Sequence, residues 1–216
     1  MTFNANKVAT GGSKFTPAAP VEVGTYPARL VQLIDLGVQP RKPYQGQEKD
    51  PIQMIWVTYE LTNEFMKDES GNDIEDKPRW ISESFPFYNL RADRAKSTAR
   101  YMAIDPQVEK GGNWDQLLGC PVSVSVVHNS SGDRTFANIG NTAPVMKGMP
   151  VDELKNETVV FSLDEPDLEV FNALPEFLQE KIKGNINYQG SALATLLGGG
   201  TVAAPQVEEP AENPFG

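Results

Sequence analysis

The sequence has very little cysteine and histidine. Its 216 residues include one of each, Cys120 and His128. A single cysteine excludes an intramolecular disulfide framework, and one histidine beside one cysteine leaves too few ligands for a His/Cys metal cluster. We therefore expect no metal ion and no other cofactor.

Long hydrophobic runs are also missing. The first twenty residues contain no apolar run of the signal-peptide type. No later stretch approaches the roughly 20 apolar residues that a membrane-spanning helix needs. We therefore expect a soluble, cytoplasmic protein that makes no contact with a membrane.

Recognisable catalytic motifs are absent as well. The stretch Gly11-Gly12-Ser13-Lys14 lacks the preceding strand and the full spacing of a phosphate-binding loop. His128 has no serine or cysteine nearby in a nucleophile setting, and the acidic stretch 67–77 lacks the spacing of a calcium loop. We expect that the protein is not an enzyme.

The chain has no excess of basic residues. With 19 basic and 29 acidic side chains its formal net charge is -10, which disfavours a polyanionic partner. The distribution is uneven, because residues 1–145 hold 15 basic and 17 acidic groups while residues 146–216 hold 4 and 12. The first two thirds of the chain are therefore nearly neutral.

Glycine and proline are plentiful, at 18 and 17 residues, which favours a β-rich architecture with many turns. Strand patterns occur at about 24–36, 52–61, 79–87, 122–127 and 134–139. A helix is predicted at about 91–102, with Asn89 as its N-cap. Three strands, a helix and two strands predict a mainly β, five-stranded OB-fold barrel. A β-sandwich is the alternative, although it usually needs about seven strands.

Four segments follow from this pattern. Residues 1–20 are predicted to form a flexible N-terminal arm, and residues 21–145 the OB-fold domain. Residues 146–197 are predicted to be a C-terminal helical extension that packs on the barrel. Residues 198–216 contain three prolines and three glutamates but no basic residue. This last composition is typical of a disordered acidic tail.

Alternation in the second strand predicts a binding face. If Ile55, Val57 and Tyr59 face the core, Trp56 points to the outside of the barrel, where aromatic side chains stack on bases. Nearby lysines and arginines would neutralise phosphates. For each aromatic side chain, packing in the core or under the C-terminal helices is an equal alternative. The candidate DNA-binding residues are Arg29, Arg41, Lys42, Tyr44, Lys49, Trp56, Trp80, Tyr88, Arg91, Arg134 and Phe136.

The end of the chain carries a resemblance. The sequence Glu-Glu-Pro-Ala-Glu-Asn-Pro-Phe-Gly at 208–216 resembles the C-terminal peptide of bacterial single-stranded DNA-binding proteins. It is also similar to the tail of phage-encoded single-stranded DNA-binding proteins, which pair an OB-fold with an acidic, aromatic-ended tail. In the body, Gly-Thr-Tyr-Pro-Ala-Arg-Leu at 24–30 and Leu-Leu-Gly-Cys-Pro-Val at 117–122 look like segments that lead into strands of such phage proteins.

This resemblance implies a function for the whole chain: sequence-independent binding of single-stranded DNA in phage DNA replication, recombination or repair, in the host cytoplasm. It further implies that the tail recruits replication or recombination enzymes through Glu208, Glu209, Glu212, Pro214 and Phe215. One departure is that Gly216 follows Phe215, whereas phenylalanine carries the terminal carboxylate in the bacterial tail. Homo-oligomerisation is left open.

Two other classes of function remain as alternatives. A structural or virion-assembly β-domain would show no change in tryptophan fluorescence with DNA. An acidic, DNA-mimicking inhibitor of a host protein would bind that protein and ignore DNA.

Overall fold

The computed structural model describes residues 19–132 and 134–198. The predicted tail site at Glu208, Glu209, Glu212, Pro214 and Phe215 lies outside the described residues. So do residues 1–18, nearly all of the predicted N-terminal arm.

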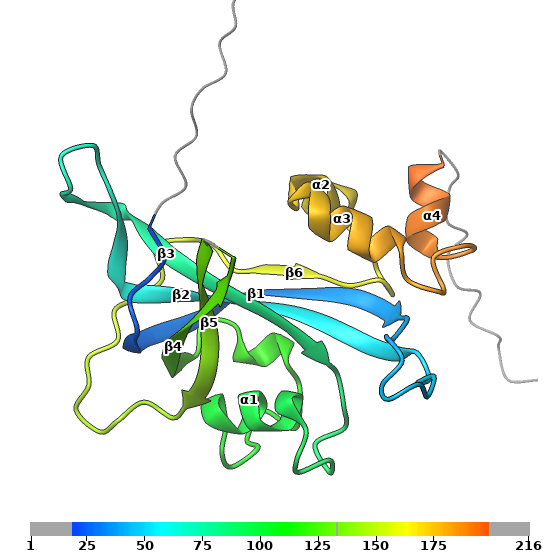
Figure 1. The fold of residues 1–216 in the computed structure, drawn as a ribbon, viewed down its shortest axis with the longest axis horizontal. Coiled ribbons are helices and arrows are strands. Elements are labelled where there is room, and N and C mark those ends of the chain that lie inside the picture. The colour runs from blue at the N-terminus through cyan, green and yellow to red at the C-terminus, as the bar shows by residue number, and fades with distance from the viewer. Residues whose placement is uncertain (1–18, 133, 199–216) are drawn as a thin grey trace, which may run out of the picture.

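Six strands form one sheet that curls into a half-barrel (Figure 1). The paired order is β3-β2-β1-β4-β5, with antiparallel neighbours, and β6 pairs in parallel with β1. The predicted mainly β class is confirmed in this barrel-like form. The strands are β1 (Gly24–Gln39), β2 (Ile52–Lys67), β3 (Asp73–Pro86), β4 (Pro121–Ser131), β5 (Arg134–Ala143) and β6 (Val159–Phe161).

Short helices lie on both sides of the sheet (Figure 1). Helix α1 (Lys96–Ile104) and the 3₁₀ turn η2 (Asp115–Leu117) stand between β3 and β4. Helices α2 (Leu168–Ala173), α3 (Glu176–Lys183) and α4 (Ala192–Leu197) follow β6. Within residues 19–132 and 134–198, no helix has the length and apolar character needed to cross a membrane.

Several boundaries differ from the sequence prediction, and two of them have a clear local cause. Helix α1 begins at Lys96 rather than near residue 91, because the Asn89 side chain accepts the Arg91 N–H (3.0 Å) and closes a turn instead of capping a helix. Strand β2 continues to Lys67, because the hairpin turn is made by Asp68. The Asp68 carboxylate accepts the N–H groups of Ser70 and Asn72, each at 2.8 Å.

The core on the inner face of the half-barrel follows the predicted alternation of β2. Ile55, Val57, Tyr59 and Leu61 are all buried there. Tyr101 of α1, with Trp114 and Leu117 at η2, closes this core from below the sheet. Burial of these apolar side chains is the main term that stabilises the fold.

A second core lies on the outer face of the sheet, where the C-terminal helices pack. Ile34 and Leu36 of β1 point away from the barrel interior and contact this layer. Part of the outer face is therefore covered by protein. The other buried members of this core are Phe161, Phe171, Leu174, Leu178, Ile182 and Leu193.

Helix α1 connects the two ends of the paired order, β3 and β5. The buried Arg100 guanidinium donates through Nε to Glu83 on β3 (2.6 Å) and through Nη1 to the Asn141 amide oxygen on β5 (3.3 Å). Lys96 adds a second ion pair to Glu83. A side-chain bridge thus spans the gap between these strands.

Candidate nucleic-acid interface

The outer face of β2 and β3 presents two tryptophans. Cross-strand pairing sets Trp56 opposite Ser84 and Trp80 opposite Glu60, with the pair Thr58–Ser82 between them. Directly opposed residues share one face of an antiparallel pair. At about 3.3 Å per residue, four residues separate the two tryptophans by about 13 Å along the strands.

These tryptophans border a groove between the sheet and helices α2 and α3. We call it the outer groove; its volume is about 680 Å³. The Trp56 ring meets Phe177 of α3 edge-on, with centroids 5.5 Å apart, whereas Trp80 is 43% exposed. One tryptophan is therefore packed into the wall while the other is open. The lining includes Trp56, Trp80, Ser82, Val170, Leu174 and Phe177.

The floor of the outer groove is polar and internally bonded. The Trp56 indole N–H donates to the Thr58 hydroxyl oxygen at 3.1 Å. That hydroxyl donates to the Gln32 amide oxygen (2.9 Å) and lies 2.9 Å from the Ser82 hydroxyl. These contacts fix the side chains between the two tryptophans before any ligand arrives.

A buried carboxylate holds Trp80. The Trp80 indole N–H donates to Glu60 at 3.1 Å, and Glu60 also accepts the Lys155 N–H (2.7 Å) and the Asn156 amide (2.6 Å). Burying a charge is costly unless donors surround it. Glu60 therefore orients Trp80 and fastens residues 155–156 to the sheet. An acidic residue between the core residues Tyr59 and Leu61 was the available sequence signal for Glu60.

A second group of candidates lies at one end of the sheet, in residues 40–51 and 87–96, which we call the basic aromatic end. Gln39 pairs with Ile52, and the Phe87 N–H donates to the Gln53 carbonyl at 2.8 Å, so both segments emerge at the same place. Together they carry six basic and three acidic side chains. This composition is opposite in sign to that of the whole chain.

Tyr44 stands at the tip of a small hairpin within the first segment. Tyr44 and Gln47 exchange backbone hydrogen bonds of 2.9 and 3.0 Å around Gln45 and Gly46, whose φ values are +51° and +77°. Two such residues are typical of a type I′ turn. The tyrosine is 60% exposed, with the Lys49 ammonium 4.5 Å from its ring centroid. The predicted Arg41 and Lys42 are exposed in the same loop.

Tyr88 and Arg91 belong to the second segment. Both are exposed, and with Phe87 they line a cavity of about 590 Å³ that Gly111 and Gly112 face. Phe87 is 37% exposed. Strand β3 ends at Pro86, so the inward–outward alternation no longer applies at residue 87.

Arg29 has a different environment from the other candidates. Its guanidinium donates to the carbonyls of Gly119 (2.7 Å) and Asp152 (2.8 Å) and to the Glu153 carboxylate (2.9 Å). Its side chain is 14% exposed. Arg29 therefore ties two distant segments to β1.

Arg134 and Phe136 lie at the opposite end of the sheet from the basic aromatic end. Strand β4 pairs with β1 only through Gly24 to Arg29, so the β4–β5 turn extends past the start of β1. Loop 40–51 follows the C-terminal end of β1, at the other end of the sheet. The side chains of Arg134 and Phe136 are both exposed.

No model of a known protein family matches this chain, and no curated protein is detectably similar to it. The outer groove and the basic aromatic end are therefore interpreted from their own chemistry. The resemblance to phage-encoded single-stranded DNA-binding proteins stays a prediction.

Proposed function

We propose that the protein binds single-stranded DNA along the outer face of β2 and β3 and at the basic aromatic end. One observation carries this proposal. The outward positions of β3 run from Trp80 through Ser82 and Ser84 to its end at Pro86, followed by Tyr88 in the basic segment. From Trp80 to Pro86 the outward face of β3 extends about 20 Å, at about 3.3 Å per residue, and the exposed Tyr88 and Arg91 follow the end of the strand.

The chemistry favours a single strand over a duplex. Unpaired bases expose their faces, and each base stacked on an aromatic side chain contributes about 1–3 kcal/mol with little regard to sequence. Among the residues that line the outer groove in the described structure there is no lysine or arginine. The groove is therefore suited to bases, while Arg41, Lys42 and Arg91 at the basic aromatic end are suited to phosphates.

The fold class supports the same proposal. Strand β1 pairs with both β2 and β4, and α1 stands between β3 and β4, as in an OB-fold barrel. OB-folds bind oligonucleotides on the face of strands two and three and at the loops after strands one and four. Here those loops are residues 40–51 and the turn beside Arg134 and Phe136. The C-terminal helices narrow that face into a groove.

In this proposal the protein coats exposed single strands during replication, recombination or repair. The acidic tail would recruit partner enzymes through Phe215 and its neighbouring glutamates. Support for the tail's role comes only from its resemblance to the tails of single-stranded DNA-binding proteins.

The test is a titration of the full chain with oligo-dT and with a duplex of equal length at two salt concentrations, following tryptophan emission. We expect the single strand to quench emission strongly and salt to weaken binding. No response to any oligonucleotide at low salt would contradict the proposal and favour a structural domain or a DNA mimic.

The Trp80→Phe variant identifies the reporter. Trp114 is buried and Trp56 packs on Phe177, so most of the quenching should come from Trp80. The variant keeps an aromatic ring but should lose most of the emission change, while the anisotropy of a labelled oligonucleotide still reports binding. Unchanged quenching would show that the DNA path does not cross Trp80.

A further inference from the structure

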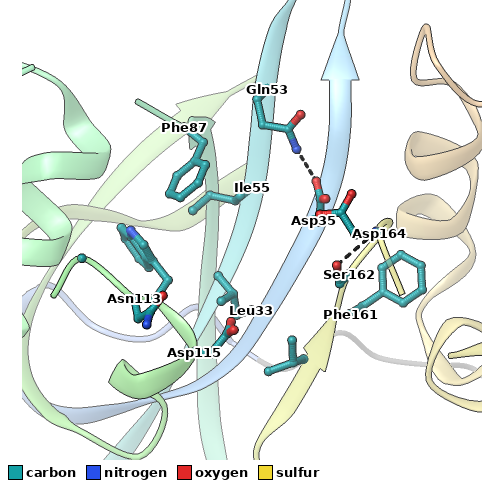
Figure 2. A pocket seen from close by; sticks show the side chains of 13 residues that line it. Leu33, Asp35, Gln53, Ile55, Phe87, Asn113, Asp115, Phe161, Ser162 and Asp164 are labelled. Atoms are coloured by element: carbon teal, nitrogen blue, oxygen red, sulfur yellow. Dashed lines mark hydrogen bonds between the residues drawn. The ribbon is translucent and has the colours of Figure 1, made fainter. Parts of the chain in front are cut away.

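A cavity of about 470 Å³ opens where the half-barrel meets the basic aromatic end (Figure 2). Figure 2 shows Phe87 and Ile55 on one side of it and Asp35 and Asp164 on the other. Trp114 belongs to the apolar wall, with its ring 6.0 Å from that of Phe87. Apolar and acidic groups are both present around the cavity, since Phe161 lies on the same side as Asp164 and Asp115 lies near Leu33.

Three carboxylates, which are hydrogen-bond acceptors, line this cavity beside the amides of Gln53 and Asn113 and the Ser162 hydroxyl. Asp35 is held in place because its Oδ1 accepts the Gly37 N–H at 2.8 Å and the Gln53 amide N–H, and burial raises the pKa of its carboxyl. One N–H of the Gln53 amide is thereby engaged. Asp115 and Asp164 add two exposed carboxylates. Among the described lining residues there is no lysine or arginine, so the cavity repels phosphate.

A ligand for this cavity must combine a flat apolar body with hydrogen-bond donors. Nucleobases have that form, and they differ in the polar groups on their edges. Cytosine carries an amino donor where thymine carries an oxygen acceptor. A thymine oxygen facing carboxylates would leave acceptors opposed to acceptors, whereas a cytosine amino group would donate to them.

We propose that this cavity takes one unstacked base bearing an exocyclic amino group, so that cytosine is preferred to thymine. The inference rests on the proposed function and refines it. Phe87 and Trp114 also line the neighbouring cavity that contains Arg91. A phosphate bound at Arg91 would therefore place its neighbouring base beside the Phe87 ring.

The test compares unlabelled oligo-dC and oligo-dT of equal length as competitors of a labelled oligonucleotide, at pH 8, where cytosine is neutral. We expect oligo-dC to compete at least about fivefold better, the lower limit for reading one base edge. Equal competition, or better competition by oligo-dT, would overturn the inference and leave the proposed function standing. No competition by either would overturn both.

The variant Asp35→Asn assigns the preference to the cavity. It supplies an amide donor for a thymine oxygen, so the ratio of the two affinities should fall toward one. Asp93→Asn is the matched control, because Asp93 is exposed at the basic aromatic end and loses the same charge. The control should bind both oligonucleotides more tightly and keep the ratio.

Because the Leu163 N–H also faces the Asp35 carboxylate, the Asp35→Asn variant could fail to fold. A second variant therefore tests the same cavity without changing Asp35. The double variant Asp115→Asn and Asp164→Asn changes two exposed acceptors of the same cavity. Its ratio should fall as well. A wild-type ratio in folded samples of both variants would overturn the inference.

Discussion

Trp80 is an exposed aromatic side chain with a fixed orientation, because its indole N–H is bonded to the buried Glu60. We expect Trp80→Ala to weaken the affinity for oligo-dT by about 5- to 150-fold, the loss of one stacked base at about 1–3 kcal/mol. Fluorescence anisotropy of a labelled oligonucleotide measures it. Ile186→Ala, at an exposed apolar residue between α3 and α4, should leave the affinity unchanged. Equal effects of the two variants would contradict a stacking role.

The ionisation of Asp35, which lines the cavity, should also affect the stability of the fold. Burial, with a contribution from Asp164, raises the pKa of the Asp35 carboxyl above its ordinary value. An acid whose pKa is higher in the folded state binds its proton more tightly there, so stability falls as pH rises through that pKa. The stability of the wild type relative to Asp35→Asn should therefore be highest in acid and decrease toward pH 7.

Thermal melting of the wild type and Asp35→Asn from pH 3.5 to 7 measures this change. The variant has no titrating group at residue 35, so a constant difference in Tm across the range would show that burial does not perturb Asp35. Asp93→Asn provides the comparison for an exposed carboxylate.

At the scale of elements, α1 joins β3 and β5, the two ends of the paired strand order, through Arg100. Its side chain is 4% exposed and that of Glu83 is 8% exposed. Removing one partner of a buried ion pair costs about 3–5 kcal/mol when the other partner is left uncompensated. Because Lys96 still pairs with Glu83, we expect Arg100→Leu to lower the free energy of unfolding in urea titrations by less than that amount. Arg94→Leu, at an exposed position, should change it little; a similarly small loss for Arg100→Leu would mean the bridge is dispensable.

Most strands and their order could be predicted because alternation marks them. Ile55, Val57 and Tyr59 specify the inner face of β2, and that assignment also places Trp56 on the outer face. Helix α4 lies within the segment 146–197 that is predicted to be a helical extension, and local signals mark its ends. Ser191 caps it by accepting the Ala194 N–H at 3.1 Å, and Gly198 ends it.

The site was less predictable than the strands, because its geometry depends on contacts between distant residues. The acceptors for Arg29 lie at residues 119 and 151–153, and no local pattern connects them to β1. Phe177, which packs against Trp56, belongs to a helix more than 100 residues later. Alternation predicts the face of a side chain; tertiary packing determines whether that side chain remains exposed.

For the whole molecule, the uneven charge distribution predicts the effect of shortening the chain. Removing residues 201–216 takes away three glutamates and no basic residue. Because net negative charge opposes binding of a polyanion, the shortened chain should bind oligo-dT at least as tightly as the full chain. The anisotropy of a labelled oligo-dT, titrated with each chain at two salt concentrations, measures the two affinities. A loss of DNA binding would mean that the tail contributes directly to the interface.

Hydrogen bonds from the C-terminal helical segment also fix the position of the chain where the basic aromatic end begins. The Gln39 amide donates to the Lys181 carbonyl at 2.9 Å, and the Ile186 N–H donates to the Val38 carbonyl at 2.9 Å. These bonds anchor the chain immediately before loop 40–51, and the Tyr44–Gln47 bridge orders the loop tip. The conformational entropy of arranging Tyr44 is therefore largely lost during folding. Less of it remains to oppose association, so this preorganisation favours affinity without adding a contact.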